Sequence, residues 1–557
     1  MIRKLFLASF CILSFVSSLR ANTINALSCS QSAVQAATLL ATVSDIVNIP
    51  AGNCTWTSPV TISHGMILQG AGQDVTVISA SGTDLLLING DGTAFRLTGM
   101  SFTGNNSQAA IQIGGRFSSF RMDHVKFTNL PARAIIIGTA DPKTNTAIYG
   151  LIDHITFTST GAAPFGLEYG DSNQAWTSPD NWGTNQAMYL EDSTFVWNTG
   201  STQPNSNHDV WDTEGGARAV IRHNTITNGV IQGHDTGSTA QNRANRIKEV
   251  YANTWICGGN YTGSDCGNAP IDFRGGSSIF FDNVIPICNQ NLSCATGTAP
   301  KGWEGPTQTE IWRIDGTSPA SSHPWNFTAN GTQKNIASDF RSHCDGGTFP
   351  VCGEYENPGS ACSTITCGGG TCGTCVDNPT QVTPPVTILS RIDGGSGTNP
   401  GSYPARDQVG RGQDSADHTT QALVPAYWWN NTQSAVSDNP NAQLNTLQVG
   451  GTLTNYIKIN RDVFLTDTAN CAAGGGSCAK GVGRGTLAQR PANCSNADFL
   501  GSFPGPAYFA TDTNTLYQCT ATNIWSNYYK PFTYPHPLQS GTSAAAPPTN
   551  LRVTSVQ

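Results

Sequence analysis

Six short segments of the chain align with one another, and the last four carry ionisable side chains at two matching positions. Their third and fifth residues supply four carboxylic acids, one imidazole and one guanidinium, which are groups that general acid–base catalysis uses. These groups are therefore the first candidates for chemistry. The segments are "AIQIGG", "AIIIGT", "GLEYGD", "VWDTEG", "VIQGHD" and "PIDFRG", which begin at residues 110, 134, 166, 210, 230 and 270. The ionisable residues are Glu168, Asp212, Glu214, His234, Asp272 and Arg274.

The second residue of every segment is apolar, which predicts that it points into a core. Because side chains alternate faces along a strand, the third and fifth residues then point outward. Parallel strands lie about 4.8 Å apart, so stacking the segments would bring the six ionisable groups onto one outer patch. The inward positions are Ile111, Ile135, Leu167, Trp211, Ile231 and Ile271, and the third positions are Gln112, Ile136, Glu168, Asp212, Gln232 and Asp272.

Two kinds of chemistry fit such a patch, and the residues leave both open. Paired carboxylates can act as acid and base around a glycosidic bond, since like-charge repulsion keeps one of them protonated. Alternatively, Glu168, Asp212 and Asp272 hold Ca²⁺, which bridges to an acidic sugar while His234 or Arg274 transfers the proton of a β-elimination. The catalytic set in both cases is drawn from Asp212, Glu214, His234, Asp272 and Arg274. A structural explanation competes with both: outward strand positions are polar in any stacked sheet, and opposite charges there form ordinary surface networks.

Aromatic residues lie close to the patch in the sequence. Trp176, Trp182 and Trp211 could stack on sugar rings, which present apolar faces, and Glu168 would bind substrate beside them. Trp176 and Trp182 belong to an insertion, "DSNQAWTSPDNWGTNQ", that could form one wall of a groove. The alternative for each tryptophan is a hydrophobic plug under a long loop.

A second set of segments reveals the repeat that would position these residues. Their third residue is always apolar and their eighth is always large and apolar, at intervals too variable for a helix. The sixth residue becomes Asn224, Asn253 and Asn283, which predicts a ladder of amides running from coil to coil. The segments are "FRLTGMSF", "FRMDHVKF", "GLIDHITF", "MYLEDSTF", "AVIRHNTI", "KEVYANTW" and "SIFFDNVI", beginning at residues 95, 120, 150, 188, 219, 248 and 278.

The fifth column of these segments holds His124, His154, Asp192 and His223. Imidazoles on adjacent coils could hold a metal, and the acids beside the first three could bind Ca²⁺. The column falls at a turn, however, where exposed polar residues are ordinary.

Short strands at a period near thirty, with Gly/Asn/Asp turns and no helices between them, predict an all-β right-handed parallel β-helix. "SAVQAATLLATVS" predicts a helix that caps its N-terminal end. "VNIPAGNCTW" and "MILQGAGQDVTVIS" resemble the opening of β-helix proteins of the pectate-lyase-like superfamily, and the resemblance spans roughly residues 30 to 290. That superfamily contains lyases, hydrolases, esterases, epimerases and inert adhesins, so it fixes no activity.

The order of acids, His and Arg along the chain loosely resembles the site of polygalacturonases. Their adjacent Asp pair is missing here, and so is their Arg-x-Lys on the matching strand, because "NRIK" at 245–248 falls elsewhere in the coil. The resemblance therefore leaves hydrolysis and elimination equally open.

The chain as a whole favours export. Residues 1–21 have the basic start, apolar run and small residues of a signal peptide, and no second long apolar run predicts membrane insertion. A net charge of -8 without a basic tract argues against nucleic acid. Cys11 lies in the signal, and the other 16 of the 17 cysteines predict disulfides, several between near neighbours such as Cys471 and Cys478. "CSTITCGGGTCGTC" favours two disulfides over a zinc knuckle.

We therefore expect a signal peptide (1–21), a cap and main coils (22–295), a Cys/Gly-rich irregular excursion that wraps the solenoid (296–420), late coils with a C-terminal cap (421–539) and a linker (540–557). The expected function is cleavage of an extracellular polysaccharide by a lyase or hydrolase. The alternative is a non-catalytic carbohydrate-binding adhesin or matrix protein.

Overall fold

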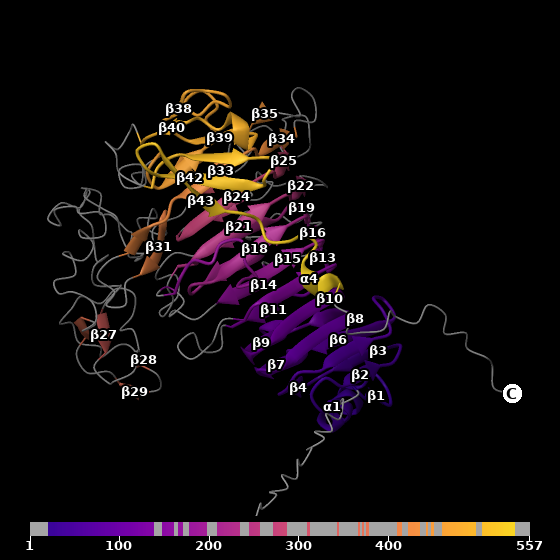
Figure 1. Cartoon of the computed structure of the whole chain (residues 1–557). Coiled ribbons are helices and arrows are strands. Elements are labelled where there is room, and N and C mark those ends of the chain that lie inside the picture. The colour runs from indigo at the N-terminus through magenta and orange to yellow at the C-terminus, as the bar shows by residue number, and fades with distance from the viewer. Residues whose placement is uncertain are drawn as a thin grey trace, which may run out of the picture.

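The computed structural model of the chain is dominated by parallel β-strands (Figure 1). No helix in the described part of the chain is long and apolar enough to cross a membrane. The structure describes residues 21–138, 148–160, 165–170, 176, 178–197, 209–233, 244–256, 271–273, 275–286, 309–311, 342–344, 366–367, 370–371, 375–377, 409–414, 421–434, 442–443, 447–449, 459–496 and 504–540.

The strands pair in register into three parallel ladders, and the chain visits the three in turn. The first ladder contains β1 (Thr23–Asn25), β2 (Ile46–Ile49), β5 (Ile67–Gly70), β8 (Ala94–Asn105), β10 (Ser119–Thr128), β12 (Gly150–Asp153), β15 (Met188–Glu191), β18 (Arg218–Arg222), β21 (Ile247–Tyr251), β24 (Ser277–Phe281), β33 (Ala426–Trp429) and β37 (Val463–Leu465). The second contains β3 (Gly52–Trp56), β6 (Thr76–Ser81), the later halves of β8 and β10, β13 (Thr156–Ser159), β16 (Thr194–Trp197), β19 (Thr225–Thr227), β22 (Thr254–Ile256), β25 (Val284–Pro286) and β34 (Thr432–Ser434).

The third ladder is a separate ten-stranded sheet, and it carries the segments of the predicted patch. Its last strand but one, β26, lies within the 296–420 region that the sequence predicts to be irregular. The ladder contains β4 (Val60–Ile62), β7 (Leu86–Asp91), β9 (Ala109–Arg116), β11 (Arg133–Ile137), β14 (Phe165–Gly170), β17 (Asp209–Glu214), β20 (Val230–Gly233), β23 (Ile271–Phe273), β26 (Thr309–Ile311) and β36 (Leu447–Val449).

The core between the ladders is made of the columns that the repeat predicts. In the first ladder Met122, Ile152, Leu190, Ile221 and Val250 stand opposite one another from strand to strand. In the second, a run from Phe102 through Phe127, Phe157 and Phe195 does the same. All of these side chains are buried in one cluster, because each strand of the stack presents its apolar alternate residues to the same interior.

The predicted amide ladder is present. The Oδ1 of Asn253 accepts from the backbone N–H of Asn224 at 3.0 Å, and the Oδ1 of Asn283 accepts from the N–H of Asn253 at 3.1 Å. Asn431 continues the ladder at one end and Asn224 bonds the N–H of Ser193 at the other. The four asparagines are buried, so each amide satisfies backbone groups that water does not reach.

Replacing Asn253 by Ala is expected to lower the free energy of unfolding by about 2 kcal/mol. The change leaves the N–H of Asn224 and the carbonyl oxygen of Ile221 buried without their present partner. Denaturant unfolding of the variant measures the loss. Asn53 is exposed on β3, and Asn53→Ala is the matched control with an expected change within about 0.5 kcal/mol. Equal stability of the two variants would contradict a stabilising ladder.

From β10 onward, each described corner between the first and second ladders has a single residue with positive φ. The angles at His124, His154, Asp192 and His223 are 52°, 51°, 54° and 57°, and Ala252, Asp282 and Asn430 continue the series. Asn, Asp and His tolerate this left-handed conformation better than most residues. The backbone of the corner therefore accounts for the polar residues that the sequence places in this column.

The helix predicted near the N-terminus is present as α1 (Gln31–Leu40), with the Ser30 hydroxyl accepting from the N–H of Ala33. It lies at the end of the stack where β1 to β4 begin (Figure 1). A disulfide between Cys29 and Cys54 ties its preceding segment to β3. Gly52 is required beside this bridge, because a Cβ there would come within 2.7 Å of the Cys29 Sγ.

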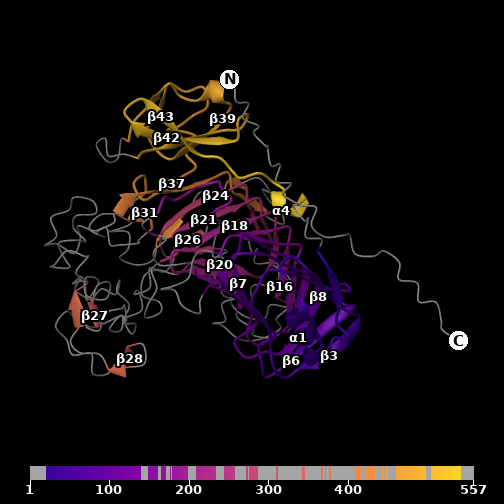
Figure 2. The same cartoon turned by 60° about the horizontal axis from the view of Figure 1, so that its bottom comes forward.

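At the opposite end lies a smaller, four-stranded sheet (Figure 2). Its strands are β39 (Val482–Gly485), β41 (Ala507–Ala510), β42 (Thr515–Ala521) and β43 (Ile524–Tyr529). One face packs on the outside of the first ladder, where Phe509, Leu516 and Tyr529 join Phe281 and Tyr427 in a second apolar cluster.

From this sheet the chain returns along the first ladder as residues 530–540, here termed the strap, which ends in α4 (Pro537–Ser540) beside β12 (Figure 1). The strap was not predicted. The C-terminal residues thus cover part of the outer side of the first ladder.

The remaining elements are short. Cys471 and Cys478 form a disulfide, as their proximity predicts, and Cys494 bonds Cys519. The other near-neighbour cysteine pairs and the four cysteines of "CSTITCGGGTCGTC" have no described side chains. The short elements are β27 (Ser342–Cys344), β28 (Thr366–Cys367), β29 (Gly370–Thr371), β30 (Cys375–Asp377), β31 (Arg411–Asp414), β32 (Gln421–Leu423), β35 (Ala442–Gln443), β38 (Ser477–Cys478), β40 (Asn493–Cys494) and the 3₁₀ turn Leu487–Gln489.

Candidate functional site

The third ladder brings the predicted acids into one column. Glu168 stands opposite Asp212, Asp212 opposite Gln232, and Gln232 opposite Asp272. This pairing is the one that the alignment of the six segments predicts. The next strand adds Glu310, which stands opposite Asp272 and was missed because the sequence alignment stopped before β26.

The column lies on the side of the sheet away from the core. Leu167, Trp211 and Ile231 alternate with the column residues and are buried in the main apolar cluster. Alternation along a strand then puts Glu168 and Asp212 on the outer face. This face is protected, because Asp212 is 4% exposed and Gln232 1% exposed.

Only part of the second predicted column is described. Gly170 stands opposite Glu214 on β17, which agrees with the alignment, but the Glu214 side chain is not described and neither is that of Asp272. His234 and Arg274 lie outside the described residues. Their convergence with the acids therefore stays a prediction.

Glu168 has a charged partner that the sequence analysis missed. The guanidinium of Arg133, from the start of β11, forms an ion pair with the Glu168 carboxylate. Arg133 precedes the aligned segment by one residue, so only a longer alignment would have included it. The pair is only partly buried, with side chains 35% and 14% exposed, and it fixes the Glu168 carboxylate beside Asp212 without removing it from solvent.

Lys248 approaches the column from the first ladder. Its side chain is fully buried and its ammonium donates to the carbonyl oxygen of Gln232. Gly233 follows Gln232, where a Cβ would collide with Asn245 and with the Lys248 ammonium. The sequence predicts that "NRIK" lies outside the strands of the third ladder, and β21 indeed belongs to the first ladder. The Lys248 side chain nevertheless crosses the interior and contacts the backbone of the third ladder.

The predicted aromatic platform is wrong. Trp176 and Trp211 are fully buried, and the indole N–H of Trp176 donates to the carbonyl oxygen of Ala244 at 3.2 Å. Trp182 is half-buried against Tyr528 and Tyr529 of β43, on the side of the first ladder. None of the three offers an open ring face at the column. The alternative explanation, hydrophobic plugs, accounts for them.

The histidine column forms carboxylate–imidazole pairs. Asp123 and Asp153 each contact the Nδ1 of the following histidine at 2.8 Å, and the rings of His124 and His154 stack with centroids 5.1 Å apart. The hydrogen bond that His124 makes to the Asp123 carboxylate raises the pKa of His124. Among the described residues, no three His, Cys, Asp or Glu side chains lie close enough to hold a metal ion.

The Ca²⁺ set predicted from Glu168, Asp212 and Asp272 includes one undescribed side chain. Carboxylate oxygens are the ligands that Ca²⁺ prefers, and Glu168 and Asp212 stand on neighbouring strands. These two residues fit the donor set in kind. The Ca²⁺ site remains a prediction.

No protein-family model matches the chain, and no curated protein matches it. Among solved structures, the alginate lyase from Paenibacillus sp. str. FPU-7 is similar with 16% identity and a TM-score of 0.33, over 47% of this chain and 94% of that one. ORF18 of Geobacillus virus E2 is similar with 14% identity and a TM-score of 0.21, over 47% of this chain and 61% of that one. At these scores the likeness identifies neither a reaction nor a substrate, and membership of the pectate-lyase-like superfamily stays a prediction.

Proposed function

We propose that the chain is a secreted right-handed parallel β-helix protein, capped by α1, that binds and cleaves an extracellular polysaccharide along the outer face of the third ladder. The observation that carries the proposal is the column in which Glu168, Asp212, Asp272 and Glu310 stand on nearby strands. A row of carboxylates that runs across the strands can contact successive units of a polymer lying in the same direction. Pairs of carboxylates cleave the glycosidic bonds of polysaccharides.

The spacing within the column suits paired carboxylates. Glu168 and Asp212 are neighbours, as are Asp272 and Glu310, so the backbones of each pair lie about 4.8 Å apart. Retaining glycosidases hold their two carboxyl groups about 5 Å apart, with one acting as acid and the other as nucleophile. Asp212 is the central residue of the proposal, because it has Glu168 on one side and Gln232 on the other.

Elimination is the other route. It needs a base that removes the proton adjacent to the carboxylate of an acidic sugar, and His234 or Arg274 would take that role. It also needs a counter-charge for that carboxylate. Ca²⁺ held by Glu168, Asp212 and Asp272 would supply the counter-charge. The three described disulfides are compatible with an extracellular location for either reaction.

A non-catalytic adhesin is the second candidate, and one observation favours it. Glu168 is already engaged by Arg133, and Asp212 is almost fully covered, as in a charge network that only protects the sheet. The two candidates differ in whether a bond is broken.

A glycan screen separates them. Incubation with acidic and neutral polysaccharides, with and without chelator, is followed by assays for new reducing ends and for the absorbance of an unsaturated uronide. Reducing ends without absorbance indicate hydrolysis, and chelator-sensitive absorbance indicates elimination. Absence of both on all substrates would leave the adhesin.

Asp212→Asn is expected to lower kcat/KM on the cleaved glycan at least about a hundredfold, because an amide neither transfers a proton nor carries charge. The matched control is Asp74→Asn, at an exposed carboxylate that pairs with Lys126 and belongs to no strand of the column. Thermal unfolding of both variants checks that they are folded. An Asp212→Asn variant with parental kcat/KM would remove the column from the mechanism.

A further inference from the structure

The four-stranded sheet carries an aromatic and cationic cluster on the face turned away from the first ladder. On β42 and β43, Leu516 and Tyr529 belong to the apolar cluster on the first ladder, whereas Cys519 and Trp525 belong to a separate cluster on the other face. Tyr517 alternates with Leu516 and stands opposite Tyr508, so it shares the face of Trp525. The guanidinium of Arg490 lies over both rings, with its carbon 4.3 Å from the ring centre of Tyr517 and 5.5 Å from that of Trp525.

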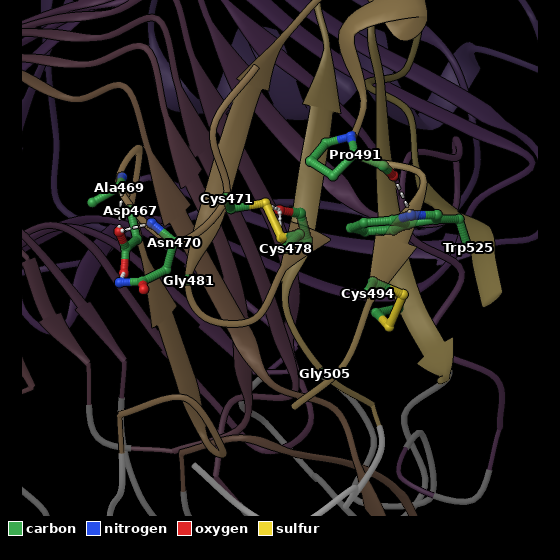
Figure 3. Close-up of a disulfide and its surroundings, with 12 residues drawn as sticks. Asp467, Ala469, Asn470, Cys471, Cys478, Gly481, Pro491, Cys494, Gly505 and Trp525 are labelled. Atoms are coloured by element: carbon green, nitrogen blue, oxygen red, sulfur yellow. Dashed lines mark hydrogen bonds between the residues drawn. A yellow bond between two sulfur atoms is a disulfide. The ribbon is translucent and has the colours of Figure 1, made fainter. Parts of the chain in front are cut away.

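Covalent and hydrogen bonds hold this cluster in place. The indole N–H of Trp525 donates to the carbonyl oxygen of Pro491 at 2.9 Å, and the Cys494–Cys519 disulfide lies beside the ring (Figure 3). The backbone N–H of Arg490 donates to the carbonyl oxygen of Leu487 at 3.1 Å, and this hydrogen bond ends the 3₁₀ turn. The rings and the backbone of Arg490 are therefore fixed before any ligand binds, and a prearranged site loses little entropy on binding.

Arg490 differs from several other arginines of the chain in having no acidic partner among the described residues. Arg96, Arg121, Arg133, Arg222 and Arg246 each form an ion pair with a described carboxylate. Within the described part of the chain, Arg490 has neither an ion pair nor a side-chain hydrogen bond.

Asp512 is the acid on the neighbouring turn. Its Oδ1 accepts from the backbone N–H of Leu487 at 2.8 Å rather than from Arg490. A guanidinium stacked on rings keeps its edge N–H groups directed outward, and that edge matches a carboxylate or sulfate.

Arg490, Tyr517 and Trp525 are each partly exposed, so a ligand can reach the rings and the guanidinium together. An exposed polar side chain borders them on the same face: Asn527 of β43 stands opposite Tyr517. Rings that stack on the apolar face of a sugar, a cation for its acid group and a polar group at the rim are the elements of a sugar site.

We propose that Arg490, Tyr517 and Trp525 form an accessory binding site for an acidic sugar residue of a polysaccharide, separate from the column on the third ladder. The sugar ring stacks on Trp525 or Tyr517, and its carboxylate or sulfate accepts hydrogen bonds from Arg490. This site goes beyond the proposed cleavage, because it anchors the polymer without reacting with it. It rests on the proposed function only for the expectation that the partner is a polysaccharide.

The test is binding of two uronate polymers, polygalacturonate and alginate, measured by affinity electrophoresis. The full mature chain carries Asp212→Asn, so that cleavage at the third ladder does not consume the polymer. Trp525→Ala and Arg490→Ala are each expected to weaken binding at least tenfold, and Arg490→Lys to restore only part of it, because an ammonium lacks the planar contact with the rings. Arg484→Gln is the matched control, since Arg484 is an exposed arginine on β39 with no ring contact of this kind among the described residues. It is expected to leave affinity within twofold.

Fully methyl-esterified polygalacturonan tests the role of the charge. The neutral polymer is expected to bind at least tenfold more weakly than the acid, and Arg490→Ala is expected to change its affinity by less than twofold. Parental affinity in the Arg490→Ala variant, equal affinity for acid and ester, or no binding of either uronate polymer would each overturn the proposal.

Cleavage is followed separately in chains that retain Asp212, using short oligosaccharides. Loss of polymer binding in Arg490→Ala with oligosaccharide cleavage unchanged supports the accessory site. Binding that depends on Arg490 in a chain that cleaves nothing would sink the proposed cleavage and leave the accessory site standing.

Discussion

Replacing Arg222 by Met is expected to lower the free energy of unfolding by about 3–5 kcal/mol, because it leaves a buried carboxylate without its counter-charge. Arg222 is fully buried on β18, and its Nε donates to Glu191 at 2.6 Å. Glu191 is equally buried, on the neighbouring strand β15. Methionine preserves most of the volume of the side chain, so the expected loss comes from charge and hydrogen bonds rather than from a cavity.

Arg222 also fastens the strap to the first ladder. Its Nη1 and Nη2 donate to the carbonyl oxygens of Phe532 and Thr533, both at 2.8 Å. The guanidinium lies 4.9 Å from the ring centre of Tyr189 and 5.3 Å from that of Tyr534. Without it, two carbonyl groups of the strap lose their donors at the same time as Glu191 loses its cation.

Denaturant unfolding of the parent and the variant measures the effect. Lys126→Met is the matched control, since Lys126 pairs with Asp74 at 2.8 Å but with side chains 29% and 68% exposed, and such pairs contribute at most about 1 kcal/mol. The Arg222→Met, Glu191→Gln double variant should recover part of the loss, because the uncompensated charge is gone. If Arg222→Met costs no more than Lys126→Met, the buried pair does not hold the strap.

The ladders and their registers could be predicted from the sequence because alternation and stacking impose strict rules. A one-residue slip would move every apolar side chain of a strand out of the core, so the apolar columns fix the pairing. The same rule gave the order Glu168, Asp212, Gln232 and Asp272, and the recurring Asn at the sixth position gave the amide ladder.

No comparable rule predicts contacts between distant parts of the chain from the sequence. Arg222 meets Phe532 across 310 residues, and nothing in either segment marks the other as its partner. The burial of Trp176 was missed for a related reason: an inserted tryptophan fits a sugar platform and a plug equally well until the surrounding side chains are known. The burial of Trp211, by contrast, agrees with the inward position that the alignment predicts for it. The disulfide between Cys471 and Cys478 was suggested by proximity, whereas Cys494 and Cys519, 25 residues apart, were not paired.

Two buried titratable groups, Glu249 on β21 beneath β43 and His536 on the strap, have pH dependences that oppose one another. Burial raises the pKa of Glu249 to about 7, against the hydrogen bonds that it accepts from the N–H of Gly183 and the hydroxyl of Tyr529, both at 2.8 Å. Between about pH 4.5 and 7 the folded chain therefore keeps a proton that the unfolded chain has lost. Stability contributed by this group falls as pH rises through that range, by up to about 3 kcal/mol, and stays low above it.

His536 has the opposite sign. Burial against Tyr189, with Arg222 and Arg121 nearby, lowers the pKa of His536 to about 4. The neutral ring accepts from the N–H of Leu538 at 3.1 Å. Between about pH 6.5 and 4 the unfolded chain takes up a proton that the folded chain refuses, so this contribution falls as pH drops, also by up to about 3 kcal/mol.

Because the two slopes nearly cancel between about pH 4.5 and 6.5, removing either group should reveal the other. Glu249→Gln keeps a carbonyl for Gly183 and is expected to gain stability relative to the parent as pH rises to 7, by up to about 3 kcal/mol. His536→Asn is expected to gain relative to the parent as pH falls from about 6.5.

The measurement is the unfolding free energy of the parent and the two variants at half-unit steps from pH 4 to 8, taken as differences so that all other carboxylates cancel. Burial also raises the pKa of Glu191, but this residue is present in all three chains, so its contribution cancels in the differences. Profiles of the two variants that run parallel to the parent would mean that neither group changes its proton affinity on folding. Opposite slopes would show that the folded chain buries a protonated Glu249 and a neutral His536, which is the state of lowest electrostatic cost for groups shielded from water.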